Sequence, residues 1–137
     1  MMVQKGAKRM NGSEMESNDS FQALFDTQVA FQQLLSDGKR LPADDLKAFS
    51  YHIQAMVEEL GELMKSDKRW KTHRNAHYDP INKLEELADV FVTSLNLALF
   101  SGFNSQTVYK AISDKIIENI AKLESAKNKE FEQEMWE

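Results

Sequence analysis

The sequence predicts an all-α fold, a bundle of four to five helices. Apolar residues recur at the three-to-four-residue spacing of amphipathic helices along most of the chain, and no stretch shows the alternation of a half-buried strand. Both prolines, Pro42 and Pro80, lie where a helical pattern begins, a position that tolerates proline. A chain of 137 residues is long enough to bury a core as one domain.

Four helical segments are expected between residues that begin or end helices, at 20–36, 43–66, 80–101 and 105–127. Gly38 and Gly102 are expected to end the first and third segments, because glycine readily adopts the left-handed backbone that closes a helix. Pro42 and Pro80 mark the starts of the second and third segments, and Ser105 is expected to cap the fourth.

The chain is expected to have three parts. Residues 1–19 are polar, rich in small residues and without periodicity, which favours a disordered leader. Residues 20–127 are expected to form the all-α domain, and residues 128–137 a charged helical extension or tail.

Composition excludes several classes of protein. A net charge of -5 argues against binding to a nucleic-acid polymer or an anionic membrane, because both normally require a basic surface. The chain has no cysteine, which excludes disulfides, thiolate metal sites and a cysteine nucleophile. No apolar run approaches a membrane span, and no secretory signal is visible at the N-terminus. A cytoplasmic protein is expected.

Two acidic motifs, Glu59-Leu-Gly-Glu62 and Glu86-Leu-Ala-Asp89, lie in the second and third segments. Residues three apart share one face of a helix, so each motif projects two carboxylates to one side. Like charges held this close repel unless a cation neutralises them, and carboxylate oxygens suit Mg²⁺, with Mn²⁺ as a substitute. These four residues are the candidate metal ligands. A further glutamate precedes each motif, Glu58 and Glu85, so the register of the ligands stays open.

Helical periodicity separates the faces of each segment. The second segment has an apolar stripe of Leu46, Phe49, Ile53, Val57, Leu60 and Met64, and the third has one of Leu84, Ala88, Phe91, Leu95 and Ala98. Opposite the second of these stripes runs a polar line of Asn82, Glu86, Asp89, Thr93 and Asn96. A polar line along an otherwise apolar helix predicts a lined cavity, and the apolar surroundings predict burial at a subunit interface or in a bundle centre.

The fourth segment carries Lys115, Asn119 and Lys122 within or beside its apolar face. Lysine is seldom buried without a partner, so these residues are candidates to bind a metal-bound polyanion such as a nucleoside triphosphate. They could equally reach solvent over the apolar face, as long basic side chains often do.

Other residue types give weaker signals. A di-iron bundle would need a Glu-x-x-His motif on two helices, and none is present. Trp70 and Lys71, in the segment between the acidic motifs, are candidates for substrate binding, although packing is the commoner role of such a tryptophan. His52, His73 and His77 are not spaced with the acids and are interpreted as ordinary residues, with contact of His73 or His77 to a phosphate as the alternative.

Five segments carry a family resemblance: Glu58-Glu59-Leu-Gly-Glu62, Arg69-Trp70-Lys71, Lys83-Leu-Glu-Glu86-Leu-Ala-Asp89-Val-Phe-Val, residues 95–102, and Lys115-Ile-Ile-Glu-Asn119. In these segments the chain resembles the all-α nucleoside triphosphate pyrophosphohydrolases, and among them the dimeric dUTPases, with MazG-like enzymes as close relatives. The resemblance extends over about residues 21–123.

The resemblance implies roles for individual residues. Glu59, Glu62, Glu86 and Asp89 would bind Mg²⁺. The chemistry of the reaction, and not the resemblance, favours Glu59 as the catalytic base, with Glu58 or Glu62 as the alternative. Lys115 and Asn119 would contact phosphates or sugar, with Lys122 beside them, and Gln28 would lie near the base. Two departures from the dimeric dUTPases are visible: the pair Phe91-Val92 replaces His-Phe, and Lys122 replaces an arginine. The glycine-containing segment that usually follows is replaced by residues 124–129.

The function expected from these features is Mg²⁺-dependent hydrolysis of a nucleoside triphosphate to the monophosphate and pyrophosphate, with dUTP or another pyrimidine deoxynucleotide favoured. A nucleoside triphosphate diphosphatase of this kind would act in nucleotide-pool sanitation as a homodimer or homotetramer. One alternative is a broad-range MazG-like pyrophosphatase. The other is a non-catalytic helical module that assembles with itself and whose acids pair with Lys115 and Lys122.

Overall fold

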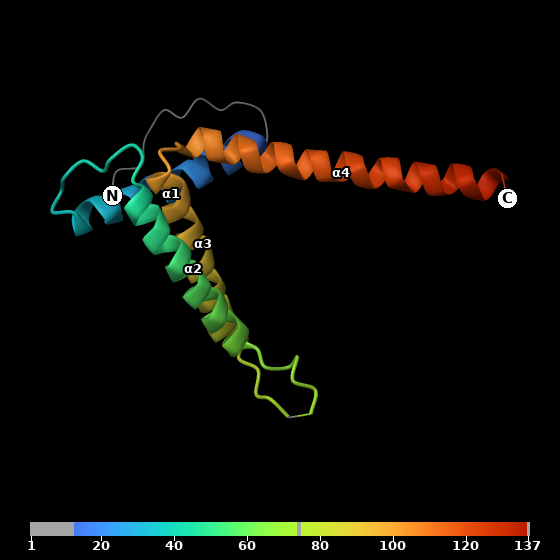
Figure 1. Cartoon of the computed structure of the whole chain (residues 1–137), viewed down its shortest axis with the longest axis horizontal. Helices are drawn as coiled ribbons and strands as arrows, with labels where there is room; N and C mark the ends of the chain where they lie inside the picture. The colour runs from blue at the N-terminus through green and yellow to red at the C-terminus, as the bar shows by residue number, and fades with distance from the viewer. Residues whose placement is uncertain (1–12, 74, 137) are drawn as a thin grey trace.

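The structure, a computed structural model, describes residues 13–73 and 75–136. This part of the chain folds into four helices: α1 (Ser13–Leu35), α2 (Leu46–Ser66), α3 (Pro80–Phe100) and α4 (Ser105–Trp136). The all-α prediction is confirmed. In Figure 1, α2 and α3 lie side by side as a hairpin, α1 crosses one end of it, and α4 extends away as a long arm.

The helix starts show which residues do the capping. Asp79 accepts hydrogen bonds from the backbone of Ile81 and Asn82 at 3.0 and 3.2 Å, with Pro80 in the first turn of α3 as predicted. The second helix begins at Leu46 rather than near Pro42, because Asp45 supplies the cap.

At the start of α4 the expected cap, Ser105, is instead the first helical residue. Asn104 takes the capping role, because its Oδ1 accepts from the backbone nitrogen of Thr107 at 2.8 Å. An asparagine one position earlier satisfies the free N–H groups of the first turn equally well, and a sequence pattern cannot distinguish the two.

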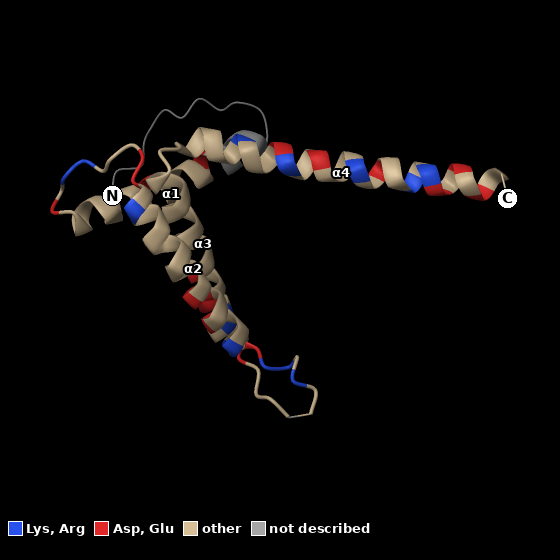
Figure 2. Ribbon diagram, viewed as in Figure 1, with Lys and Arg blue, Asp and Glu red and all other residues tan. Residues whose placement is uncertain are grey.

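Two helices are longer than predicted. α1 begins at Ser13, inside the part expected to be a disordered leader, and the rest of that expectation, residues 1–12, lies outside the described residues. α4 continues to Trp136 without a break, so residues 128–136 form a helical extension. Figure 2 shows that this part of α4 carries mixed charges along its length.

Gly102 allows a close approach at the junction of the helices. Its φ is 84°, and a Cβ atom at this position would lie 2.0 Å from the carbonyl oxygen of Ala43. Next to it, the backbone nitrogen of Asp45 donates to the carbonyl oxygen of Phe100 at 2.9 Å. The segment before α2 is therefore fixed against the end of α3.

The core is small and lies at this junction. Its buried apolar residues are Phe25 of α1 and Leu99 and Phe100 of α3. The ring of Phe21 in α1 packs on that of Tyr109 in α4, with centroids 6.0 Å apart. These contacts hold α1 against both α3 and α4, whereas neither α2 nor α3 packs along the α4 arm.

The hairpin turns its polar sides inward and its apolar sides outward. Glu59 and Glu86 are half-buried between α2 and α3, and Thr93 and Asn96 are buried. The predicted apolar stripes exist, but most of their residues face outward: Val57 is 67% exposed and Phe91 66%. A single chain thus leaves apolar faces of α2, α3 and α4 uncovered.

No single helix in the described residues has the length and apolar content of a membrane span. α3 and α4 meet those criteria only when taken together, across a bend of 117°.

Candidate functional site

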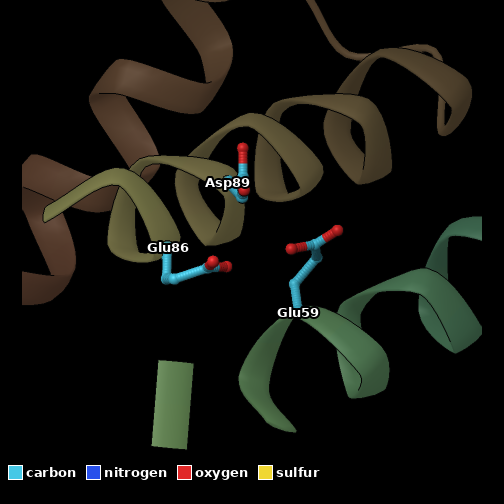
Figure 3. Close-up of side chains that lie close together, drawn as sticks. All are labelled: Glu59, Glu86 and Asp89. Carbon is cyan, nitrogen blue, oxygen red and sulfur yellow. The ribbon is translucent and has the colours of Figure 1, made fainter. Parts of the chain in front are cut away.

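Three carboxylates converge between α2 and α3. Glu59, Glu86 and Asp89 each place an oxygen within 4.8 Å of the others. Figure 3 shows Glu59 reaching from α2 towards Glu86 and Asp89, which lie one turn apart on α3. Helical spacing puts the two α3 residues on one face, and the packing of α2 on α3 brings the third to them.

The electrostatics of this group favour a bound cation. Partial burial raises the pKa of Glu59, and the carboxylates of Asp89, Glu86, Glu62 and Glu58 raise it further. Within residues 13–73 and 75–136, no lysine or arginine forms an ion pair with Glu59, Glu86 or Asp89. Three carboxylate oxygens this close are a donor set that suits Mg²⁺ or Mn²⁺.

Glu62 lies outside this group. Its side chain is more than half exposed, and its nearest basic group is Lys65, whose Nζ lies 3.9 Å away on the same helix. The structure thus brings together the other three predicted ligands and leaves Glu62 one turn further along α2. Glu58 and Glu85, which kept the register open, are exposed.

Lys115, Asn119 and Lys122 all project from the α4 arm and are exposed. Both lysines pair with Glu118 of their own helix, at 3.6 and 2.9 Å, rather than with the acidic group. Since neither α2 nor α3 packs along α4, one chain does not join these cations to its own carboxylates.

Trp70 and Lys71 lie in the loop that joins α2 to α3. Trp70 is 60% exposed, and the Lys71 ammonium lies 5.2 Å from the centroid of its ring. The charged residues of the hairpin gather towards this loop in Figure 2. The loop therefore presents an aromatic face and positive charge at the end of the hairpin.

An ion cluster that the sequence did not reveal anchors this loop. Asp67 accepts two hydrogen bonds from the Arg69 guanidinium, at 2.8 and 2.7 Å, one from the Arg69 backbone nitrogen at 3.2 Å, and one from Lys83 of α3 at 2.8 Å. The Arg69 guanidinium also stacks on Tyr78, 3.5 Å from the ring centroid. These hydrogen bonds hold the pKa of Asp67 far below its usual range. Nothing in the sequence indicated the pairing of Asp67 with Lys83, which lie 16 residues apart, because this pairing depends on the path of the loop.

Gln28 points into the junction and contacts the predicted polar line of α3. Its Nε2 donates to Oδ1 of Asn96 at 2.7 Å, and Gln32 donates to the same oxygen at 3.3 Å. Nδ2 of Asn96 lies 3.5 Å from Nδ1 of His52, whose ring stacks on Phe100. Gln32 and His52 were missed as site residues. The spacing of Gln28 and Gln32, one turn apart in an apolar helix, is the signal that could have found the first of them.

Two cavities lie near the junction and not at the acidic group. One of about 420 Å³ is bounded by α1, the segment before α2 and the start of α4. The other, of about 400 Å³, is lined by Gln32, His52, Tyr51 and Phe100 among others. The second cavity adjoins the amide network. Neither is lined by Glu59, Glu86 or Asp89.

Comparison with known proteins gives one match. A family model described as dUTPase matches residues 20–136, which is nearly the whole described chain. Searches for similar curated proteins and for similar solved structures found no match. Because the family model covers far more than half of the sequence and the fold is helical, the chain belongs to the all-α dUTPase-like family.

Proposed function

We propose that this protein hydrolyses a deoxynucleoside triphosphate to the monophosphate and pyrophosphate with Mg²⁺, and that dUTP or another pyrimidine deoxynucleotide is the preferred substrate. The observation that carries the proposal is the convergence of Glu59, Glu86 and Asp89 from two helices. Membership of the dUTPase-like family supports nucleotide hydrolysis in general.

Each carboxylate has a role in this proposal. Glu59, Glu86 and Asp89 would hold the ion, and Glu62, whose charge acts on Glu59, is proposed as a further ligand. When bound, Mg²⁺ supplies charge neutralisation at the phosphates and a water of lowered pKa. Glu59 is the proposed proton acceptor, with Glu58 or Glu62 as the alternative.

The polar line of α3 gives the substrate a direction. Glu86 and Asp89 lie at one end of it and Asn96, which binds Gln28, at the other. Residues at this spacing follow one face of a helix. We therefore place the phosphates at the carboxylates and the base near Gln28. Trp70 and Lys71 are proposed to contact the nucleotide from the hairpin loop.

We further propose that the functional form is a homodimer or a tetramer built from it. The outward apolar faces of α2 and α3 resemble an interface more than the surface of a monomer, and an apolar groove of about 260 Å³ lies between the end of α3 and the start of α4. Charge complementarity points to a second copy as the partner. The unpaired acids on one hairpin would meet Lys115 and Lys122 on the arm of the other copy, with Asn119 between them.

The alternative of a non-catalytic module required the acids to pair with Lys115 and Lys122. In the described residues these lysines pair with Glu118 instead. Within one chain these lysines therefore do not neutralise the acids. Pairing across two copies is open to both functions, so the enzyme is distinguished by a rise in melting temperature with Mg²⁺ and nucleotide, which the module does not predict. The broad-range pyrophosphatase stays as the second candidate function, because Trp70 in the loop is exposed and offers an aromatic face on which any base can stack.

A substrate panel tests the proposal. Pyrophosphate release would be measured with Mg²⁺ for the canonical deoxynucleoside triphosphates, for dUTP and for the ribonucleotides. We expect dUTP or dCTP to give the highest kcat/KM. Equal rates for all bases would support the broad-range enzyme, and no turnover of any triphosphate would refute the proposed function.

A further inference from the structure

The amide network around Asn96 has a defined direction. Oδ1 of Asn96 accepts from the Nε2 atoms of both Gln28 and Gln32, so the Asn96 amide must turn its nitrogen the other way. That nitrogen lies 3.5 Å from Nδ1 of His52. Burial lowers the pKa of His52, which keeps the ring neutral near pH 7 and leaves one ring nitrogen able to accept.

The network fixes which atom of Gln28 is free. With its nitrogen directed at Asn96, Gln28 keeps its carbonyl oxygen Oε1, and in the described residues no group donates to that oxygen. If the side-chain amide of Asn96 were flipped, so that its oxygen and nitrogen exchanged places, the amide of Gln28 would have to flip too. Gln28 would then offer N–H groups to a ligand instead of its oxygen. Gln32 and Asn96 are buried, at 8% and 6% exposure, so their orientations cannot be exchanged for hydrogen bonds to bulk water.

Gln28 itself is only half-buried and lies beside the polar line that leads to the acidic group. It is thus a member of the network that a ligand in the proposed site can reach, whereas Gln32 and His52 line the neighbouring cavity of about 400 Å³. His52 is held in place from the other side by its stacking on Phe100, with ring centroids 5.1 Å apart and planes 10° apart. The orientation of Gln28 therefore depends on residues that need not touch the ligand.

We propose that Asn96, held by His52, is a positioning residue for base selection: it leaves the Gln28 oxygen to meet N3 of a bound pyrimidine. Uracil carries a hydrogen on N3 and can donate to that oxygen. Cytosine carries a lone pair on N3 and is repelled in the same pose. This inference rests on the proposed function and deepens it, because it names the base and the residues that select it.

The test compares kcat/KM for dUTP with kcat/KM for dCTP in the full-length protein with Mg²⁺. In Asn96→Leu the network is lost and Gln28 can turn over, so the dUTP/dCTP ratio should fall about tenfold, the equivalent of one hydrogen bond. Asn96→Asp is the matched control. A carboxylate can only accept, so it keeps the Gln28 nitrogen in place, and the ratio should stay within about 1.5-fold of the original.

A purely structural role for Asn96 would lower both kcat/KM values together and leave their ratio unchanged. An unchanged ratio in a folded Asn96→Leu protein, or a wild-type preference for dCTP, would therefore overturn the proposal. His52→Phe provides a second route if Asn96→Leu does not fold. It keeps an aromatic ring on Phe100 but removes the acceptor, so the ratio should fall by about threefold, and an unchanged ratio overturns the proposal in that case. A wild-type protein that hydrolyses neither nucleotide would refute the proposed function itself.

Discussion

Glu59 of α2 and Asp89 of α3 present carboxylate oxygens within 4.8 Å of one another, in a group completed by Glu86. In the described part of the chain, none of the three forms an ion pair with a basic residue. Among the described residues their mutual repulsion is therefore unrelieved, and a divalent cation would relieve it. Metal binding, stability and turnover should consequently change together when these residues are altered.

Removing one charge from the group should abolish turnover without unfolding the protein. For Glu86→Gln and Asp89→Asn we expect metal-dependent pyrophosphate release to fall by about 100-fold or more, because ion binding and charge stabilisation in the transition state are both lost. Glu85→Gln is the matched control, since Glu85 is exposed and lies outside the group. Circular dichroism should show unchanged helix content in all three variants. Full activity in Glu86→Gln or Asp89→Asn would rule out the assigned metal site.

The pH dependence of stability should change when metal is added. The pKa of Glu59 is raised in the folded protein, so the folded state binds this proton more tightly than the unfolded state does. For such an acid, stability falls as the pH rises from the unfolded pKa through the folded one. As the pH rises from about 4.3, the usual glutamate pKa, towards neutrality, ionisation of Glu59 should therefore lower the melting temperature of the metal-free protein.

Thermal melts with and without Mg²⁺ measure this effect. Mg²⁺ with a non-hydrolysable dUTP analogue should raise the midpoint at pH 7, because a ligand of the native state alone stabilises it by about 2.7 kcal/mol at a hundred times its Kd. The increase should shrink at about pH 4.5, where protons compete for the same oxygens. Glu59→Gln should lose most of the increase. A shift of the same size in that variant would place the cation elsewhere.

The ion cluster at Asp67 should matter for substrate affinity more than for folding. Hydrogen bonds from Arg69 and Lys83 lower the pKa of Asp67. The stability that this carboxylate contributes is therefore present at neutral pH and is lost as the pH falls below the usual aspartate value of about 3.9. In Asp67→Asn the loop that carries Trp70 loses its anchor. We expect KM to rise by about fivefold or less, because the basic partners are half-exposed, with kcat nearly unchanged.

Steady-state kinetics and tryptophan fluorescence together test this prediction. Asp44→Asn, at an exposed position before α2, is a control for the charge change. A fall in kcat at constant KM in Asp67→Asn would mean that the cluster supports the chemistry and not the loop.

The helices and the pair of Glu86 and Asp89 in the candidate site could be predicted from the sequence because both depend on local spacing. Periodicity and the two acidic motifs predict which faces of α2 and α3 carry carboxylates, and the structure brings Glu59, Glu86 and Asp89 together. The direction in which those faces point could not be predicted. A helical wheel assigns an apolar face to the interior, but Val57 and Phe91 are exposed in the single chain while Thr93 and Asn96 are buried.

Contacts between residues far apart in the chain could not be predicted from the sequence either. The pairing of Asp67 with Lys83 depends on the path of the loop, and the contact between Gln28 and Asn96 depends on how α1 crosses the hairpin. Single polar residues in apolar helices have several plausible partners. The place of Lys115 was likewise not predictable, because periodicity cannot tell whether α4 folds back on its own hairpin or extends from it.

Mixing two inactive variants decides which copy supplies the cations of α4. If Lys115 and Lys122 act on the carboxylates of the partner, a dimer of Glu86→Gln with the double variant Lys115→Ala/Lys122→Ala contains one intact site and one doubly altered site. Random exchange makes about half of the dimers mixed, so about a quarter of all sites, and of the wild-type activity, should return. If each site is built from one chain, every site in the mixture carries a substitution and no activity returns.

Light scattering provides the necessary control for this experiment. It must show a dimer or tetramer for each variant and for the mixture, because absence of exchange would also give no activity. Unfolding and refolding the chains together ensures exchange. Recovery near a quarter would establish a site shared between copies, whereas no recovery after proven exchange would place Lys115 and Lys122 over the carboxylates of their own chain. In that case α4 would have to swing towards the hairpin when substrate binds, closing the 117° bend between α3 and α4 further.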